Sequence, residues 1–468
     1  MAAPDQQKQT GSIKARLNNW WLWFESILNH EFSITHGSLL IMASFLISAG
    51  LGIVRQALFN AAFGTGFEAN AYYAAFRLPD TLVTLIAGGT LTNALIPVLL
   101  STSHRKGEQA GQHLINLVMT SLIAFVGICT ILGLIFTPWF VNVVLAPGFD
   151  QATSQLTISL TRITLFEVLI IAISSVCTAL LNSRNRFLLP TLGIAIHNVT
   201  MISGILLGSA VPAIGIYGPA VGTIFDALLQ LVIMIPGLRR LNWRFKVAWD
   251  PRDSDLREVV RLLIPNGLSG LVNYAGGIVD TRYGSLINNA SGLPALNNAL
   301  LLIGLPIRLL GMAIAQATFP RLAAHVAEEN WPGLRSLMKR ALLISIGLGL
   351  LALVGLVLVG HPLIKLLFER GRFDAEASAL TYHLLVMYAI GLPAYIGTEI
   401  ITRCLIALHD TRTPLLTNCL QLAGRIALIP LWDQSLGIAS IALAFAVTSI
   451  GETLLLGSVL WLKLRKRH

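Results

Sequence analysis

The chain has 468 residues, of which 54% are hydrophobic and only 12% are charged, and its formal net charge is +10. In soluble globular domains about a quarter of the residues are charged, so this composition excludes a soluble protein and favours one with many membrane-spanning helices. The positive charge does not predict a nucleic-acid partner, because the lysines and arginines are distributed by loop, as they are in membrane proteins.

The first residues are polar and lack the short apolar core and small-residue cleavage site of a signal peptide. We therefore expect residues 1–35 to remain as a cytoplasmic N-terminal extension. Apolar side chains recur in it at helical spacing: Leu17, Trp20, Trp21, Phe24, Ile27 and Leu28. This stripe predicts an amphipathic helix that either lies in the membrane interface or packs on the protein's own cytoplasmic face.

Long apolar runs occupy most of the chain from residue 36 onward. We predict an all-α integral membrane protein with about twelve transmembrane helices, each of roughly the 20 residues that a bilayer requires. The predicted spans are residues 36–62, 70–100, 112–142, 154–182, 188–210, 214–237, 258–289, 295–322, 337–367, 377–407, 414–431 and 436–462.

The spans divide into two six-helix lobes. Residues 36–237 form the predicted N-lobe, and residues 258–468 form the C-lobe with a short basic tail. A polar, basic segment, residues 238–257, joins them as a cytoplasmic linker. Its alternating aromatic and basic side chains suit a connector along the membrane interface, in contact with anionic lipid heads.

An internal duplication relates the two lobes. Pro138–Thr157 and Pro362–Thr381 share Pro, Phe-Asp, Ser and Leu-Thr at a constant offset of 224 residues. Gly52–Val54 matches Gly277–Val279 at an offset of 225. Several matches in the same order at nearly one offset indicate repetition rather than similar composition.

The repeated segment is predicted to close the third span of each lobe, cross the outer surface and begin the fourth span. Asp150 and Asp374 then stand where an N-cap residue is needed. We therefore interpret the repeated segment as scaffold rather than substrate site.

Lysines and arginines concentrate in alternate loops, and the opposite loops have almost none. By the positive-inside rule, both termini and the central linker are cytoplasmic. The outer loop with Arg370 and Arg372 is an exception, diluted by neighbouring acids.

Charged residues inside the spans are candidate binding residues, because a charge at that depth usually faces a polar cavity or a partner. Arg55 lies near the middle of the first span. Arg77 and Asp80 are three residues apart on one helix face and are predicted to pair, beside Pro79, which should kink or unwind the second span. His197 is interpreted as a helix-packing residue rather than a proton carrier.

The second lobe has a matching break at Pro306, followed by Arg308. Broken helices in corresponding positions of two halves are typical of a transporter's substrate site. Arg282, inside the seventh span, completes the set of predicted substrate-binding residues: Arg55, Arg77, Asp80, Arg282 and Arg308. Two of the arginines come from the first lobe and two from the second, so a substrate held by both would couple their motion.

The sequence contains no phosphate-binding loop, no Ser-His-Asp or Cys-His constellation, and no loop long enough for a soluble catalytic domain. Its four cysteines are isolated, without metal-ligand or disulfide spacing. We therefore expect neither an enzyme nor a bound cofactor or metal. An ion gradient or the membrane potential is the expected energy source.

The chain resembles the MurJ (MviN) family of lipid II flippases, in the multidrug/oligosaccharidyl-lipid/polysaccharide exporter superfamily. The resemblance is carried by G-L-G-I-V-R-Q, F-G-T-G-F-E-A-N-A-Y-Y-A-A-F-R-L-P-D, A-P-G-F-D, L-L-N-S-R-N-R-F-L-L-P and F-E-R-G-R-F-D. It implies two lobes around a central cavity that opens alternately to each side of the bacterial cytoplasmic membrane. It also implies a polyprenyl-diphosphate-linked glycan, lipid II, as the substrate, bound by cavity arginines.

This chain departs from the family pattern in several cavity positions. Ala49, Asn70, Thr84, Leu301 and Gly304 stand where family members usually carry charged residues. Two alternatives therefore remain open: a flippase for another polyprenyl-linked glycan, such as an O-antigen or exopolysaccharide unit, and a non-transporting membrane scaffold.

Overall fold

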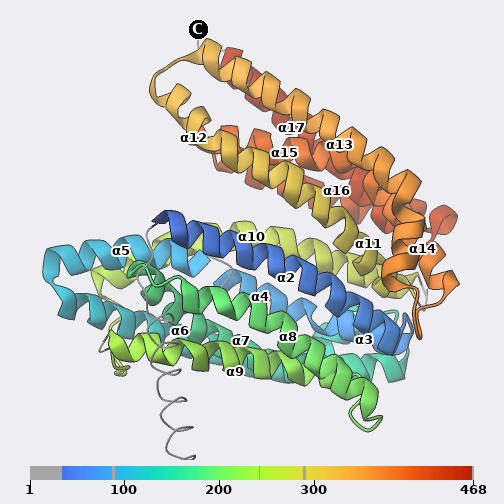
Figure 1. Ribbon diagram of the computed structural model, residues 1–468, viewed down its shortest axis with the longest axis horizontal. Helices are drawn as coiled ribbons and strands as arrows, with labels where there is room; N and C mark the ends of the chain where they lie inside the picture. The colour runs from blue at the N-terminus through green and yellow to red at the C-terminus, as the bar shows by residue number, and fades with distance from the viewer. Residues whose placement is uncertain (1–33, 87–89, 242, 288–290, 466–468) are drawn as a thin grey trace, which may run out of the picture.

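The computed structural model describes residues 34–465, except residues 87–89, 242 and 288–290. The regular structure in this part of the chain is helical (Figure 1). The predicted amphipathic helix of the N-terminal extension and the last residues of the basic tail lie outside the described residues.

The first half contains eight α-helices and one π-helix among the described residues. In chain order they are α2 (Ile34–Phe63), α3 (Phe67–Ala75), α4 (Arg77–Ile86), α5 (Thr90–Lys106), α6 (Glu108–Trp139), η1 (Phe140–Leu145), α7 (Gln151–Ser183), α8 (Leu188–Ala210) and α9 (Tyr217–Arg240). The predicted fifth span, 188–210, coincides with α8.

The second half is built in the same way. Its helices are α10 (Ser254–Leu286), α11 (Gly292–Pro306), η2 (Ile307–Met312), α12 (Ala313–Ala327), α13 (Trp331–Phe368), α14 (Ala375–Ala389), α15 (Leu392–Ala407), α16 (Arg412–Leu436) and α17 (Ala439–Arg465). Between α9 and α10 the described residues of the linker form neither helix nor strand.

Eight helices of the described residues are long and apolar enough to cross a membrane, and the bent pair α14–α15, with a 46° angle, makes a ninth. The first, second and seventh predicted spans correspond to α2, the α3–α5 series and α10. Large apolar side chains face outward along α13, where Leu351 is 68% and Leu358 is 72% exposed. Because such a surface is stable only against lipid, the protein is a multi-pass, all-α membrane protein.

One of the two predicted helix breaks is confirmed. The second span is interrupted at Phe76, a turn between α3 and α4, so that Pro79 falls in the first turn of α4, where its missing N–H costs little. The break predicted at Pro306 is replaced by a change of helix type: α11 continues past Pro306 as the π-helix η2 and then as α12, within one span from Gly292 to Ala327. A π-helical turn accommodates the missing N–H of the proline without ending the helix.

The predicted caps are also confirmed. Asp150 accepts a hydrogen bond from the Ala152 N–H at 3.1 Å, and Asp374 accepts one from the Ala377 N–H at 2.9 Å. Each aspartate therefore satisfies a backbone donor at the start of the fourth span of its half.

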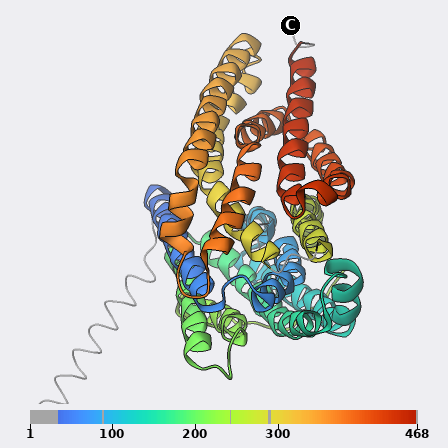
Figure 2. The same ribbon diagram turned by 90° about the vertical axis from the view of Figure 1, so that its right-hand side faces the viewer.

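The helices form two layers that meet at one end and diverge toward the other (Figure 1). The first-half helices make one layer and α11–α17 make the second, which stands above the first when viewed from the end where they meet (Figure 2). α10 opens the second half of the sequence but packs mainly against α4 and α5, so it lies with the first layer. The first helices of both halves, α2 and α10, therefore lie in the same layer.

Candidate functional site

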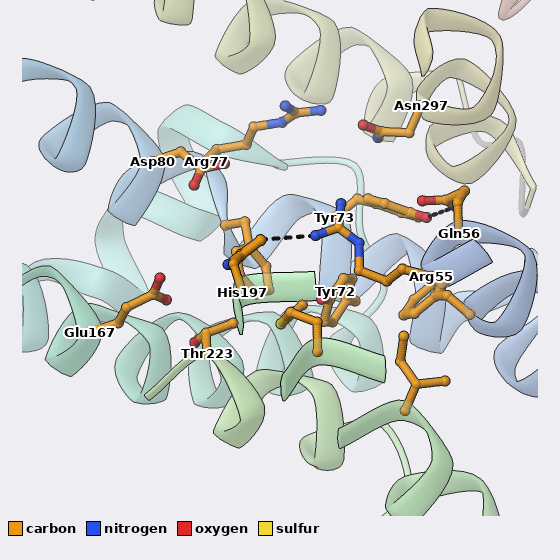
Figure 3. A pocket seen from close by; sticks show the side chains of 14 residues that line it. Arg55, Gln56, Tyr72, Tyr73, Arg77, Asp80, Glu167, His197, Thr223 and Asn297 are labelled. Atoms are coloured by element: carbon orange, nitrogen blue, oxygen red, sulfur yellow. Dashed lines mark hydrogen bonds between the residues drawn. The ribbon is translucent and has the colours of Figure 1, made fainter. Parts of the chain in front are cut away.

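A polar cavity of about 240 Å³ lies on the first layer and faces the second. Arg55 enters it from α2, Arg77 and Asp80 from α4, and His197 from α8 (Figure 3). Asn297 of α11 contributes from the second half. The cavity therefore contains three of the five predicted binding residues and reaches both halves.

Arg55 belongs to a hydrogen-bonded chain that crosses three helices. Its Nη1 lies 2.9 Å from His197 Nε2, and His197 Nδ1 lies 2.7 Å from an Asp226 carboxylate oxygen of α9. The same oxygen accepts a hydrogen bond from Gln230 at 2.9 Å. Because an arginine only donates, this geometry requires a neutral His197 that accepts at Nε2 and donates from Nδ1.

The protonation state of His197 therefore decides how Arg55 is held. With a neutral ring, the Nε2 lone pair orients Arg55, and the Nδ1–H donates to one carboxylate oxygen of the buried Asp226, which is 1% exposed. A protonated ring has no acceptor for Arg55 and places a second positive charge beside it. The hydrogen bonds of a neutral His197 therefore fix the orientation of the Arg55 guanidinium.

Arg77 crosses from the first half to α10. Its Nε donates to Thr281 Oγ1 at 3.0 Å, and Thr281 itself is fully buried. Among the described residues Arg77 forms no direct ion pair with Asp80, although both line the cavity. The sequence brought these two together on one helix turn, but the nearby hydroxyl competes for the guanidinium.

The remaining two predicted residues lie elsewhere. Arg282 donates from Nη1 to the carbonyl oxygens of Val143, at 2.6 Å, and Val144, at 3.0 Å, near the end of η1. Arg308 is exposed on η2, next to Ile307, which lines a separate cavity. The structure thus gathers Arg55, Arg77 and Asp80 but not Arg282 or Arg308.

That second cavity, of about 290 Å³, occupies the second half. At its wall Arg425 of α16 forms an ion pair with Asp280 of α10, and its guanidinium lies 4.8 Å from the centre of the Phe445 ring. Two further acids, Glu399 and Glu452, line the same space. The second cavity therefore carries acids as well as a cation that is already neutralised.

The two cavities are related by the duplication, with one inverted charge. Arg55 and Asp280 are 225 residues apart, the offset that also relates Gly52–Val54 to Gly277–Val279. In each half the first-helix residue contacts a cation or histidine of the fifth helix: Arg55 contacts His197, and Asp280 contacts Arg425. Only the first half thus presents an arginine from its first helix to the cavity.

Sequence reasoning missed His197 and Asp226 as site residues. The sequence did contain an indication of this pair. Asp226 and His197 both lie well inside adjacent spans, and an acid buried in a span needs a partner. Their pairing depends on the rotation of α8 against α9, which one sequence does not specify. Among the described residues, no group of three His, Cys, Asp or Glu side chains is arranged to hold a metal ion.

Charged contacts at the diverging ends of the layers stabilise the loops. The Lys106 ammonium hydrogen-bonds Asp255 at 2.7 Å and lowers the pKa of that carboxyl. At Asp410 burial raises the pKa, but the hydrogen bonds from Lys463 and Thr413, together with the Lys463 charge, outweigh burial and leave a pKa of about 2. Both acids therefore stay ionised at neutral pH and tie neighbouring loops together.

Comparison with known proteins gives one consistent family. Residues 59–468 match the family model described as lipid II flippase MurJ. A probable lipid II flippase MurJ of Rhizobium meliloti is 26% identical over 417 residues, which cover 88% of this chain and 77% of the relative. A lipid II flippase MurJ of Burkholderia cenocepacia is 26% identical over 439 residues, covering 92% and 84%.

Solved structures agree with the fold. A lipid II flippase MurJ in an inward closed conformation superimposes with a TM-score of 0.78 at 23% identity, covering 90% of this chain and 87% of that one. A multidrug resistance MATE family transporter in an inward-facing conformation also gives 0.78, at 12% identity and 91% and 98% coverage. An outward-facing MATE family transporter gives 0.65, at 13% identity and 94% and 98% coverage.

Proposed function

Because this chain belongs to the MurJ family of lipid II flippases, we propose that it moves lipid II across the bacterial cytoplasmic membrane by alternating access. The observation that carries the proposal is the cationic cavity between the halves, where Arg55 and Arg77 converge from α2 and α4. A lipid-linked diphosphate has an anionic head group that needs cations inside an otherwise apolar protein.

The cavity offers the chemistry that a diphosphate requires. Arg55 and Arg77 each supply a planar guanidinium group that donates hydrogen bonds. Tyr73, whose hydroxyl accepts a hydrogen bond from Gln56, lines the same cavity. Guanidinium groups bind phosphate oxygens through paired hydrogen bonds. We assign the first contacts with the substrate to Arg55, Arg77 and Asp80, and a later contact to the exposed Arg308.

Arg282 has a different role in this proposal. Its guanidinium already holds two carbonyl oxygens at the end of η1. We therefore assign it to the support of the transport movement rather than to the substrate.

The two layers diverge at the ends that carry the basic loops (Figure 1). If these loops are cytoplasmic, as their charge suggests, the cavity faces the cytoplasm, where lipid II is made accessible. The substrate's polyprenyl chain would remain in the bilayer while its head group enters between the layers. No nucleotide-binding motif occurs in the sequence, so an ion or the membrane potential would drive the cycle.

The direct test is complementation of bacteria depleted of their own lipid II flippase. We expect this chain to restore growth, and Arg55→Ala and Arg77→Ala to lower lipid II translocation in reconstituted vesicles by about tenfold or more, because each removes a charged hydrogen-bond donor. Arg184→Ala is the control, since Arg184 pairs with Glu108 at the surface, away from the cavity.

The other outcomes separate the alternatives. Binding and translocation of a different polyprenyl-linked glycan, without rescue, would assign this chain to that substrate. Correct membrane insertion with neither binding nor translocation of any such lipid would favour a scaffold. Wild-type translocation by both arginine variants would contradict the assignment of the cavity.

A further inference from the structure

The repeated segment forms two outer loops that contact opposite halves. The first outer loop, residues 146–150, connects η1 to α7, and the second outer loop, residues 369–374, connects α13 to α14. Each touches the last turn of the first helix of the other half, namely α10 and α2. The loops therefore link the halves at the end where the layers meet.

The first outer loop fits closely against α10. The Gly148 N–H donates to Ser285 Oγ at 3.3 Å. A Cβ at residue 148 would lie 2.2 Å from the Ser285 carbonyl oxygen, so only glycine allows this approach. Arg282 binds the carbonyl oxygens of Val143 and Val144 just before the loop, and so fastens the same helix to η1.

The second outer loop fits against α2 in the same way. The Arg372 N–H donates to the Ala61 carbonyl oxygen at 2.9 Å. Gly371 has a φ of +58°, and a Cβ there would lie 2.3 Å from that oxygen. The Arg372 guanidinium also pairs with Glu68 at 3.0 Å.

These two contacts are copies of one another. Gly148 and Arg372 are 224 residues apart, and so are Ala61 and Ser285. The contact of Gly148 with Ser285 therefore maps onto the contact of Arg372 with Ala61 when the halves are exchanged. This reciprocity is the property of a two-fold-symmetric interface, in which each partner makes the other's contact.

Buried hydrogen bonds between the halves complete this end. Thr65 donates to Ser291 at 2.9 Å, and Asn60 donates to Asn298 at 3.1 Å. Asn60 and Asn298 are both fully buried. The outer loops lie over this closed region.

We propose that the two outer loops form a reciprocal clamp that holds the outer end closed and that both must release before it opens. The proposal deepens the proposed function and rests on it, since a clamp has a task only if the halves move. Backbone contacts made through glycine leave no room for gradual sliding, so the clamp favours two discrete states. Gly148 and Gly371 are thus positioning residues for the movement.

The test measures how often the outer end opens. Thr65→Cys, at a position only 8% exposed, is introduced into a protein whose four native cysteines are replaced by serine. A membrane-impermeant maleimide is then applied from outside, and its labelling rate follows the population in which the outer end is open. We expect Gly148→Ala and Gly371→Ala to raise this rate by about tenfold, because a forced Cβ contact disfavours the closed state.

Two glycines provide matched controls. Gly66→Ala adds a methyl group at the outer end, and Gly437→Ala adds one at a φ of +54°, but neither Cβ would meet an atom within 4 Å. Both should label at the parent rate. Ser285→Ala removes the acceptor of the Gly148 N–H without adding an atom, so it should raise the labelling rate by a smaller factor. If the glycine variants do not accumulate in the membrane, the labelling rate of Ser285→Ala tests the clamp.

Parent-rate labelling in Gly148→Ala, Gly371→Ala and Ser285→Ala, or an equal rise in the controls, would overturn the clamp. The assay uses no substrate. A chain that does not move lipid II would still show the clamp, and a failed complementation assay would count against the proposed function alone.

Discussion

Asp280 and Arg425 form an ion pair that is almost completely removed from solvent, with side chains 11% and 5% exposed. A buried charge that loses its partner is costly, whereas loss of both charges is often neutral. Arg425 also packs on Phe445, so its removal would take away a cation–π contact. Substitutions in this pair should therefore change the stability of the second half measurably.

We predict that Arg425→Met destabilises the protein by about 3 kcal/mol, because it leaves Asp280 buried without its cation. The double variant Asp280→Leu with Arg425→Met should recover most of that loss. Thermal unfolding of purified protein in detergent, followed by tryptophan fluorescence, measures both. Equal melting temperatures for the single variant and the parent would show that Asp280 is not held by this pair.

His197 gives a prediction about the orientation of Arg55. It is hydrogen-bonded to Arg55 from α2 and to Asp226 from α9. A side chain that accepts no hydrogen bond at this position would leave the Arg55 guanidinium without its acceptor. We therefore expect His197→Leu to weaken binding of the diphosphate substrate.

The variant His197→Gln should bind as the parent does, because glutamine can accept from Arg55. His113→Leu is the control for the loss of a histidine, since His113 is exposed on α6 outside the cavity. Binding titrations of purified protein compare these variants with the parent. Binding by His197→Leu equal to that of the parent would contradict the role of this histidine.

At the residue scale, the sequence predicted the cationic side of the site better than its partners. Arg55, Arg77 and Asp80 were found because charges are rare in spans. His197 and Asp226 were not assigned, because their contact depends on helix rotation. Arg282 lies apart from the cavity because its guanidinium binds backbone carbonyls at the end of η1, and sequence spacing does not reveal that π-helix.

Among the helices, the fourth span of each half begins with the same aspartate cap. The Asp374 carboxylate accepts the Ala377 N–H, and Asp150 accepts the Ala152 N–H. These caps hold the start of α7 and α14 directly after the outer loops. Their loss should therefore loosen both the helix and the loop before it.

We predict that Asp374→Ala lowers stability by about 1 kcal/mol, the usual contribution of an N-cap side chain. Glu376→Ala, in the same first turn but without a cap contact, should have a smaller effect. Thermal unfolding compares the two variants. Equal losses would mean that charge near the helix start, rather than the cap, is responsible.

The equivalent cap at Asp150 should show an acid dependence. The Thr153 hydroxyl hydrogen-bonds the carboxylate and lowers the pKa of Asp150 below its ordinary value. A carboxyl with a lowered pKa stabilises the fold above its unfolded pKa and loses that effect as the pH falls through the folded one. The stability difference between the parent and Asp150→Asn should therefore shrink on acidification below about pH 4.

The positions of many helices could be predicted from the sequence, because the length and apolar composition of a membrane span determine where its helix lies. The fifth span and the break in the second span were predicted, whereas at Pro306 the helix continues through a π-helical stretch. The packing of α10 on α4 and α5 was not, since the duplication assigns α10 to the second half by sequence alone. Contacts between the lobes depend on the shapes of the side chains that meet there, and hydrophobic periodicity in the sequence does not specify those shapes.

For the molecule as a whole, the two layers meet at the end that carries residues 146–150 and 369–374 and diverge at the other (Figure 1). If alternating access operates, this end must open once per cycle. Thr65 and Ser291, hydrogen-bonded across the halves at 2.9 Å, lie at the centre of it. A covalent link there should arrest the cycle.

We predict that a Thr65→Cys and Ser291→Cys pair, oxidised in a cysteine-free background, stops lipid II translocation and that a reductant restores it. The control pair is Thr398→Cys with Thr453→Cys, whose parent hydroxyls are 2.7 Å apart within the second half. Translocation in vesicles measures both. Full activity in the crosslinked Thr65–Ser291 protein would exclude opening at this end.

The inverted charge at Arg55 and Asp280 also bears on how the gene arose. A duplication starts from two identical copies, so one of these positions has since changed sign. A chain assembled from two copies of the first half would have an arginine at both positions and would lack Arg425. One assembled from two second halves would lose Arg55. The two halves are therefore no longer interchangeable, because each supplies a charged residue that the other lacks.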